Sequence, residues 1–176
     1  MKLFPSPAAC SLADHIVLEW SGAPYEAQVV SRDDRKQPWF HALNPAGAVP
    51  VLTEGDWALT QNAAILNYIA DKFPAAKLGG DGSPESRAEV NRWLGFLNAD
   101  VHPAFKPIFG STSYLGDQAF IDKSHENARK QLRGLFERVG VAQQLGLAPG
   151  PAHEHHAHRQ PAHVARGHRD AGRARD

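Results

Sequence analysis

The chain has 176 residues, enough for one ordinary domain or two small ones. Lys+Arg and Asp+Glu balance at 19 each, so no net charge attracts the chain to nucleic acid or to an anionic membrane. The single cysteine excludes an internal disulfide, and no apolar run resembles a secretion signal or a membrane span, so we expect a cytoplasmic protein.

The first 80 residues alternate strand and helix patterns. Ser11 and Asp14 have the spacing of a capping box at a helix start, and Gly22 has the position of a helix C-cap. The expected elements, in chain order, are a strand at 2–4, a helix from 11 to 20, a strand at 25–30, a short helix at 38–43, strands at 50–53 and 57–59, and a helix at 61–73. This order, βαβ followed by ββα, predicts an α/β domain over residues 1–80.

Residues 83–142 are predicted to be all helical, after a glycine-rich linker. Ser83 and Pro84 have the N-cap and first-turn positions of a long helix. The apolar residues of that helix recur at helical spacing: Val90, Trp93, Leu94, Leu97 and Val101. We expect Pro103 to kink or break the helix, and a second long helix near 117–139.

Residues 143–176 have a different composition, rich in Ala, Arg, Gly, His and Pro. They carry too little large apolar surface to offset the entropy of ordering, so we expect a disordered tail. Adventitious binding of Ni²⁺ or Zn²⁺ by the tail is one alternative role for the chain. The candidate ligands are His153, His155, His156, His158, His163 and His168.

Cys10 stands at the expected start of the first helix, where amide N–H groups and the helix dipole lower the pKa of a thiol. We therefore interpret Cys10 as a candidate reactive thiolate, and the alternative is a small residue packed under the turn. Val49 and Pro50 end a loop that begins at Asn44. A cis Val49–Pro50 bond would leave the Val49 backbone free to pair with a peptide ligand, and the alternative is a rigid turn without a ligand.

Gln61 and Asn62 open the last helix of the α/β domain, where free amides and polar side chains suit a carboxylate. Simple helix capping is the alternative. Asn91, Asn98 and His102 share one face of the first long helix, apart from its apolar stripe. His102 is a candidate catalytic residue, and a structural histidine is the alternative.

Together these motifs resemble those of the glutathione transferase family, specifically its bacterial beta-like members. They are MKLF at 1–4, PAACSLADH at 7–15, NPAGAVP at 44–50, LTQNAAILNYIA at 59–70, WL at 93–94 and HPAF at 102–105. The resemblance covers about residues 1–142. It implies a thioredoxin-like domain that binds glutathione, followed by part of the family's helical domain, and it implies a homodimer.

The resemblance also implies roles for single residues. Cys10 matches the cysteine that contacts the glutathione sulfur, and His102 matches a helical-domain histidine near that thiol; these two are the catalytic candidates. The implied glutathione-binding residues are Cys10, Arg35 or Lys36 at the glycine carboxylate, Val49, Pro50, Gln61, Asn62, Asn98 and His102. Two positions depart from the family: Pro5 stands where many members have a tyrosine, and Gln61 where many have an acidic residue.

The implied activity is conjugation of the glutathione thiolate to small electrophiles, with thiol–disulfide exchange through Cys10 also open. Glutathione is the implied co-substrate, and we expect no metal, nucleic acid or membrane partner. The main alternative is a glutathione-binding remnant without turnover. Because the family's helical domain continues beyond residue 142 and the tail does not match it, we expect a truncated or frameshifted chain whose helices expose apolar stripes.

Overall fold

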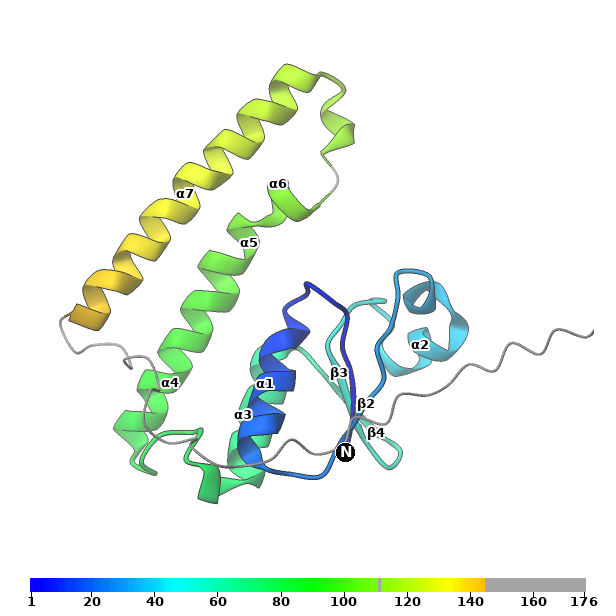
Figure 1. Cartoon of the computed structure of the whole chain (residues 1–176), viewed down its shortest axis with the longest axis vertical. Coiled ribbons are helices and arrows are strands. Elements are labelled where there is room, and N and C mark those ends of the chain that lie inside the picture. Colours follow the sequence, from blue (N-terminus) through cyan, green and yellow to red (C-terminus); the bar gives the residue numbers. More distant parts are fainter. Residues whose placement is uncertain (111, 145–176) are drawn as a thin grey trace, which may run out of the picture.

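The computed structural model describes residues 1–110 and 112–144 (Figure 1). The strands are β1 (Lys2–Phe4), β2 (Glu26–Ala27), β3 (Val51–Glu54) and β4 (Trp57–Thr60). The α-helices are α1 (Ser11–Ser21), α2 (Pro38–Leu43), α3 (Asn62–Lys72), α4 (Pro84–Phe96), α5 (His102–Ala104), α6 (Lys106–Phe109) and α7 (Gln118–Gln144). The βαβ–ββα order and the helices that follow it confirm the predicted fold class. The predicted tail, with its six candidate metal-binding histidines, lies outside the described residues except for residues 143 and 144, which end α7.

The four strands form one mixed sheet in the order β2-β1-β3-β4. β1 is parallel to β2 and antiparallel to β3, and β3 is antiparallel to β4. β2 is shorter than the strand predicted at 25–30. The N–H of Val30 still donates to the carbonyl of Pro5 at 2.9 Å, but Pro5 has no N–H with which to continue the ladder beyond Phe4.

Successive side chains of β1 and β3 point to opposite faces of the sheet, so two separate cores form. α1 and α3 cover one face, and α2 covers the other (Figure 1). The core under α1 and α3 consists of Leu3, Leu18, Leu52, Ile65 and Ile69. The core under α2 consists of Phe4, Val30, Phe40 and Val51. Within α2 only Phe40 is buried, so this one side chain anchors the helix.

Two helix ends follow the predicted signals. Gly22 has a left-handed φ of 67°, and its N–H donates to the carbonyl of Glu19 at 3.1 Å, which ends α1. Ser83 accepts a hydrogen bond from the N–H of Ser86 at 3.1 Å through its hydroxyl, and Pro84 begins α4. Both predictions are confirmed, because backbone geometry alone decides these positions.

The break predicted at Pro103 is replaced by a change of helix type. Leu97–Val101 forms a π-helical turn that joins α4 to α5. The N–H of His102 donates to the carbonyl of Leu97 in the π-helical pattern, and Pro103 follows in the first turn of α5. The chain therefore continues along the same helical path through His102, as Figure 1 shows.

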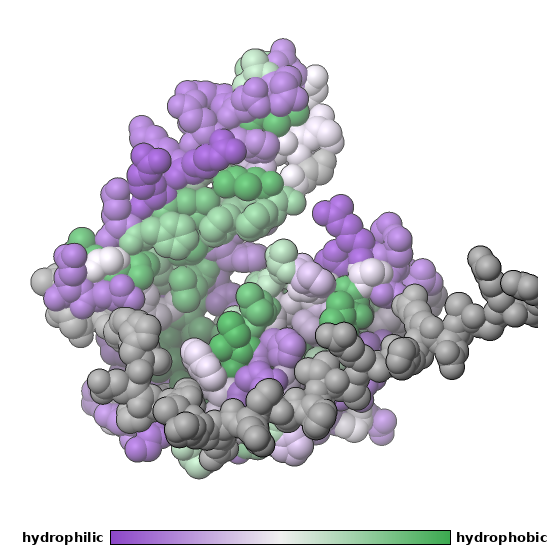
Figure 2. All heavy atoms as spheres, in the orientation of Figure 1, coloured by the Kyte–Doolittle hydropathy of each residue, from purple (hydrophilic) through white to green (hydrophobic). Residues whose placement is uncertain are grey.

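α7 packs on the helices that precede it around a small core of Val101, Ala104, Leu132 and Leu135. Large apolar side chains beside this core stay exposed: Phe109 at 68%, Phe120 at 65% and Phe136 at 51%. Figure 2 shows the resulting apolar band along the helices. The apolar stripes expected to be exposed on the two long helices are exposed only in part: Leu97 and Phe136 are exposed, but Leu132 and Leu135 are buried in this core.

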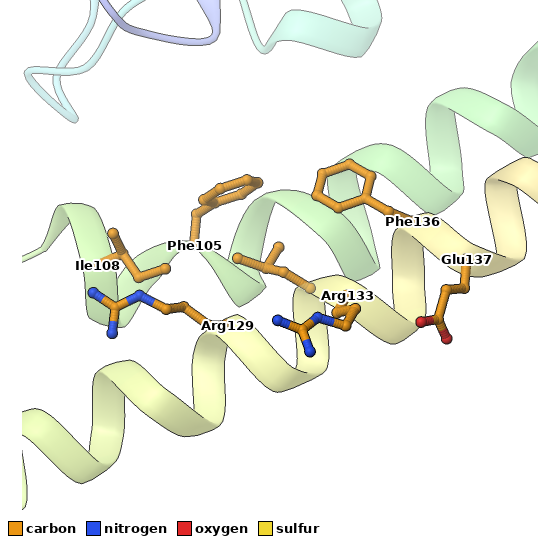
Figure 3. Close-up of a pocket in the computed structure, with 7 residues that line it drawn as sticks. Phe105, Ile108, Arg129, Arg133, Phe136 and Glu137 are labelled. Atoms are coloured by element: carbon orange, nitrogen blue, oxygen red, sulfur yellow. The ribbon is translucent and has the colours of Figure 1, made fainter.

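An open groove of about 650 Å³ lies along this band between α6, with the preceding Phe105, and α7. Figure 3 shows the apolar side chains of Phe105, Ile108 and Phe136 on it, together with the charged Arg129 and Arg133 of α7. In the part of the chain that the structure describes, no helix is both long enough and apolar enough to span a bilayer.

Candidate functional site

Two serines hold the turn between β1 and α1. The N–H of Ser6 donates to the Ser11 hydroxyl at 3.1 Å, and that hydroxyl donates to the Ser6 carbonyl at 3.3 Å. The Ser6 hydroxyl donates in turn to the carbonyl of Val30 at 2.6 Å. The predicted capping box is therefore wrong: Ser11 bonds back into the turn, Cys10 occupies the N-cap position, and Asp14 is fully buried.

The thiol of Cys10 lies half-buried at the start of α1, with its Sγ 3.8 Å from the carbonyl oxygen of Val49. Burial raises the pKa of this thiol, and the negative charge of Asp14 raises it further. The backbone N–H groups of Cys10 and Ser11 lower the pKa, as the sequence predicts, but by less. The predicted lowering of the Cys10 pKa is therefore wrong, because burial outweighs the effect of the helix terminus.

Asn62 joins the start of α3 to the start of α1. Its Nδ2 donates to the carbonyl of Cys10 at 3.1 Å and to Oδ2 of Asp14 at 3.0 Å. Gln61, directly before it, is exposed and has a φ of 74°, a strained value for a residue with a side chain. The structure thus brings the turn before α1, the loop before β3 and the first residue of α3 together around Cys10.

The loop from Asn44 to Pro50 is held by its own polar groups. Nδ2 of Asn44 donates to the carbonyl of Ala48 at 2.6 Å, and Oδ1 of Asn44 accepts the N–H of Ala46 at 3.1 Å. The Val49–Pro50 bond is cis, as expected, and Pro50 is buried. This loop therefore presents Val49 to Cys10 from a firmly held backbone.

Replacement of Gly47 by alanine is expected to lower the free energy of unfolding by about 1–2 kcal/mol. Gly47 has a φ of 60°, and a Cβ there would lie only 3.2 Å from the carbonyl oxygen of Arg35. Gly55 is the matched control, since it has a φ of 57° but open space around the Cβ position. Urea denaturation should show a smaller loss for Gly55→Ala. Equal losses would mean that the contacts of the added Cβ with Arg35 and with the His41 ring, 3.1 Å away, cost nothing.

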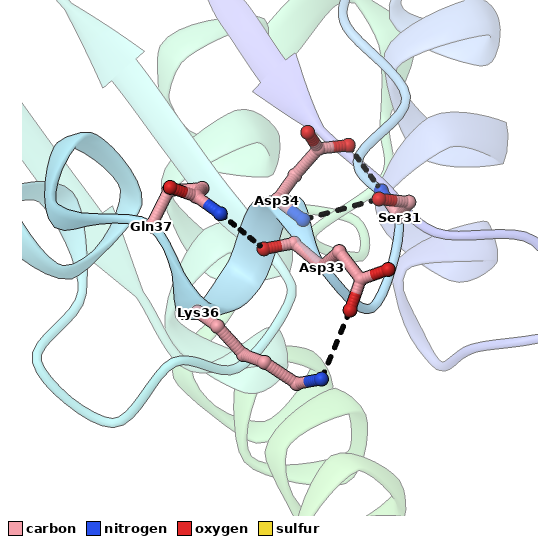
Figure 4. A network of polar contacts seen from close by, with 5 residues as sticks. All are labelled: Ser31, Asp33, Asp34, Lys36 and Gln37. Carbon is pink, nitrogen blue, oxygen red and sulfur yellow. Dashed lines mark hydrogen bonds and ion pairs between the residues drawn. The ribbon is translucent and has the colours of Figure 1, made fainter.

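The segment before α2 forms a polar network that occupies Lys36 (Figure 4). The carboxylate of Asp34 accepts the N–H of Ser31 at 2.8 Å, and the N–H of Asp34 donates to the Ser31 hydroxyl at 3.1 Å. The ammonium of Lys36 is exposed and pairs with the carboxylate of Asp33 at 2.9 Å. Lys36 therefore lies on the surface with its charge already paired.

Arg35 differs from its neighbour Lys36. Its side chain is partly buried, and its Nε has no hydrogen-bond partner among residues 1–110 and 112–144. Its carbonyl faces Gly47, so Arg35 lies beside the loop that carries Val49. Of the two cations predicted for the glycine carboxylate, Arg35 is the one with an unsatisfied donor next to the site.

Asn98 and His102 are not joined to this network. Nδ2 of Asn98 donates to the carbonyl of Leu94 in its own helix at 2.8 Å. The side chain of His102 is exposed, and within the described ranges no hydrogen bond connects it to Cys10 or Asn62. No hydrogen bond in the described ranges therefore links the helical candidates to the candidates of the α/β part.

Sequence reasoning placed Asp14 in a cap and missed its position in the site. Asp14 is 0% exposed, and its Oδ1 has no hydrogen-bond partner in the described structure. Burial raises the pKa of Asp14 to about 7, although the hydrogen bond from Asn62 opposes the rise. A signal was present: Ser11, Asp14 and Leu18 have the i, i+3, i+7 spacing of one buried helix face. An acidic residue on such a face marks a strained or functional position.

The chain matches the family model described as "Glutathione S-transferase, N-terminal domain" over residues 14–80. It is 62% identical over 139 residues to glutathione S-transferase GST-4.5 of Xanthomonas campestris, an overlap of 79% of this chain and 68% of that protein. A solved glutathione S-transferase from Xylella fastidiosa superposes with a TM-score of 0.79 and 53% identity, over 81% of this chain and 70% of that one. A sphingomonad glutathione S-transferase complexed with glutathione superposes with a TM-score of 0.67 and 36% identity, over 83% and 70%. The chain thus spans 68–70% of the length of these relatives.

Proposed function

Because the chain belongs to the glutathione S-transferase family, we propose that it binds glutathione beside Cys10 and conjugates the glutathione thiolate to small electrophiles. One observation carries the proposal: Cys10 lies 3.8 Å from the Val49 carbonyl through its Sγ and 3.1 Å from Asn62 through its own carbonyl. Three segments far apart in the sequence therefore meet at Cys10. The glutathione bound to the sphingomonad relative supports this choice of ligand.

In this proposal glutathione lies across the three segments. The backbone of Val49, before Pro50, pairs with the cysteinyl part. Gln61 and Asn62 hold the γ-glutamyl end, whose carboxylate suits the free N–H groups at the start of α3. Arg35 rather than Lys36 receives the glycine carboxylate, because Lys36 is paired with Asp33 and the Nε of Arg35 is unpartnered in the described structure.

Asn98 and His102 are proposed to contact the ligand or the second substrate from the helical part. Both side chains are exposed and therefore free to meet a molecule held between the two parts. The apolar groove along α7 suits an apolar electrophile. A homodimer and a cytoplasmic location belong to the same proposal, and sedimentation velocity tests the dimer.

In the proposed reaction the nucleophile is the sulfur of glutathione and not that of Cys10. Glutathione loses its thiol proton to solvent, its sulfur forms a bond to the electrophilic carbon, and the leaving group departs with the bonding electron pair. The S–H of Cys10 and the N–H groups at the start of α1 can donate to the sulfur anion and stabilise it. Since the pKa of Cys10 is raised, exchange through a Cys10 thiolate is the secondary proposed activity.

A second candidate function is glutathione binding without turnover. The groove between α6 and α7 is open and leaves Phe136 51% exposed, which favours a chain unable to hold a second substrate away from water. Conjugation of glutathione to 1-chloro-2,4-dinitrobenzene separates the two candidates. Retention of glutathione with no conjugation above a heat-inactivated sample would leave the binding protein.

The full chain is expected to be retained on immobilised glutathione and to be eluted by free glutathione. The same chain with Asp56→Asn, a change on an exposed turn far from Cys10 in sequence, is the control and should behave identically. Isothermal titration calorimetry then gives the dissociation constant. A chain that is folded by near-UV circular dichroism yet passes straight through would remove the proposed function.

Arg35→Ala is expected to weaken glutathione binding by roughly tenfold, because a partly buried guanidinium donates to a carboxylate more strongly than a neutral donor does. Lys36→Ala, one residue away, is the matched control and should change the dissociation constant by less than about twofold, since exposed ion pairs contribute little. Calorimetry on the two variants decides. The reverse ranking would assign the glycine carboxylate to Lys36.

A further inference from the structure

The amide of Asn62 has two neighbours that can only accept hydrogen bonds from it. One is the carbonyl oxygen of Cys10 at 3.1 Å, and the other is Oδ2 of Asp14 at 3.0 Å. A carbonyl accepts in every case, and the carboxylate oxygen next to an amide nitrogen accepts whether or not the other oxygen carries a proton. The amide must therefore turn its NH₂ group toward α1. The hydrogen-bonding chemistry of the two neighbours therefore decides which atom of the Asn62 amide is Nδ2 and which is Oδ1.

This orientation leaves Oδ1 of Asn62 as the polar atom that the side chain can offer to a ligand. No donor to Oδ1 is found among residues 1–110 and 112–144. An amide oxygen is an acceptor, so it suits a cationic or N–H group and disfavours a carboxylate. The free N–H groups at the start of α3 have the opposite preference.

Packing alone does not account for Asp14. Leu18 of α1 packs with Ile65 and Ile69 of α3 in one core cluster, and all three side chains are fully buried. Asp14, in the same helix as Leu18, is 0% exposed with Oδ1 unpartnered in the described structure, and an apolar side chain of similar size would avoid that cost. Among the described residues, the hydrogen bond that its carboxyl group receives from another element comes from Asn62.

We propose that Asp14 is a positioning residue, which holds the Asn62 amide so that its oxygen receives the ammonium group at the γ-glutamyl end of glutathione. The inference rests on the proposed function, because Asn62 must lie at that end of the ligand. Without the acceptor on Asp14, only the Cys10 carbonyl holds the NH₂ group, so the amide is less firmly oriented and the preference for the ammonium is weakened. Asp14 thereby gives the site its preference for the ammonium group. Gln61, which is neutral and exposed, does not supply this preference alone.

The test compares two ligands by calorimetry at pH 7: glutathione, and glutaryl-cysteinyl-glycine, which lacks the ammonium group alone. The unaltered chain is expected to prefer glutathione by about tenfold or more. Asp14→Leu should reduce that preference below about threefold, mainly by weaker binding of glutathione. Asp14→Asn keeps an acceptor oxygen for Asn62 and should restore most of the preference. Asp56→Asn, an exposed aspartate, should leave it unchanged.

Each other outcome overturns the proposal. If Asp14→Leu weakens both ligands equally, Asp14 has only a structural role. If the unaltered chain binds glutathione but does not distinguish the two ligands, the positioning role fails while the proposed function stands. If the unaltered chain binds neither ligand, both fail. Should Asp14→Leu not fold, Asp14→Ala removes the same acceptor and is held to the same result.

Discussion

Phe40→Ala should lower the free energy of unfolding by about 3–5 kcal/mol. Phe40 is 0% exposed and is the sole buried residue of α2, so the substitution empties the core on that face of the sheet. Its ring packs edge-on against Phe4 at 6.5 Å and against Trp39 at 5.5 Å between centroids, contacts that alanine cannot replace. Urea denaturation followed by tryptophan fluorescence measures the change.

The same substitution at an exposed ring provides the control for Phe40→Ala. Phe120 in α7 is 65% exposed, so Phe120→Ala should cost less than about 1 kcal/mol. Because α2 leads directly into the loop that presents Val49, Phe40→Ala should also weaken glutathione binding at urea concentrations where the variant is still folded. A cost for Phe40→Ala close to that of Phe120→Ala would show that α2 is held in another way.

Asp14→Asn should stabilise the protein at pH 8 and lose that advantage at pH 4. Burial raises the pKa of Asp14 to about 7 in the folded state, against 3.8 for an exposed aspartate. Between these values the folded protein binds a proton that the unfolded chain releases, so the free energy of unfolding falls as the pH rises. The stabilising contribution is complete below pH 3.8 and is lost as the pH rises through about 7. The difference between the two pKa values corresponds to a change of on the order of 4 kcal/mol in the free energy of unfolding.

Urea denaturation of both proteins at pH 4, 5, 6, 7 and 8 isolates this effect, because all other ionisable groups are shared. The difference in free energy of unfolding between Asp14→Asn and the unaltered chain should grow toward pH 7 and then level off. Asp56→Asn, an exposed substitution of the same kind, should give a difference that stays flat. A flat difference for Asp14→Asn as well would mean that its carboxyl group is ionised in the folded protein throughout.

The sequence was sufficient for features that depend on a few neighbouring residues. Gly22 and the Ser83–Pro84 pair end and begin helices as predicted, because caps are decided by local backbone geometry. β2 is short because of Pro5, which directly follows β1. Its effect arises only when β1 and β2 pair. The π-helical turn at Leu97–Val101 shows that a proline can be accommodated by shifting the bonding pattern rather than by ending the helix.

In the candidate site, too, some features could be predicted from the sequence and others could not. The positions of Cys10 and Asn62 at the starts of two helices followed from their patterns. The direction of the Cys10 pKa did not, because it depends on burial and on Asp14 more than on the helix terminus. The burial of Asp14 follows from the packing of α1 on α3, which periodicity indicates for apolar residues but which a capping motif concealed at this position.

The strand order has a consequence for how the chain folds during synthesis. β1 lies between β2 and β3, and its pairing of Leu3 with Leu52 must wait until the chain has grown past β3. The β3–β4 hairpin and α3 are contiguous and close only short loops, so we expect them to form early and to capture β1 afterwards. Since Cys10 and Asn62 come from the two halves of this assembly, a nascent chain gains the complete site only once both have joined. Glutathione added during refolding should therefore stabilise the finished domain and none of its precursors.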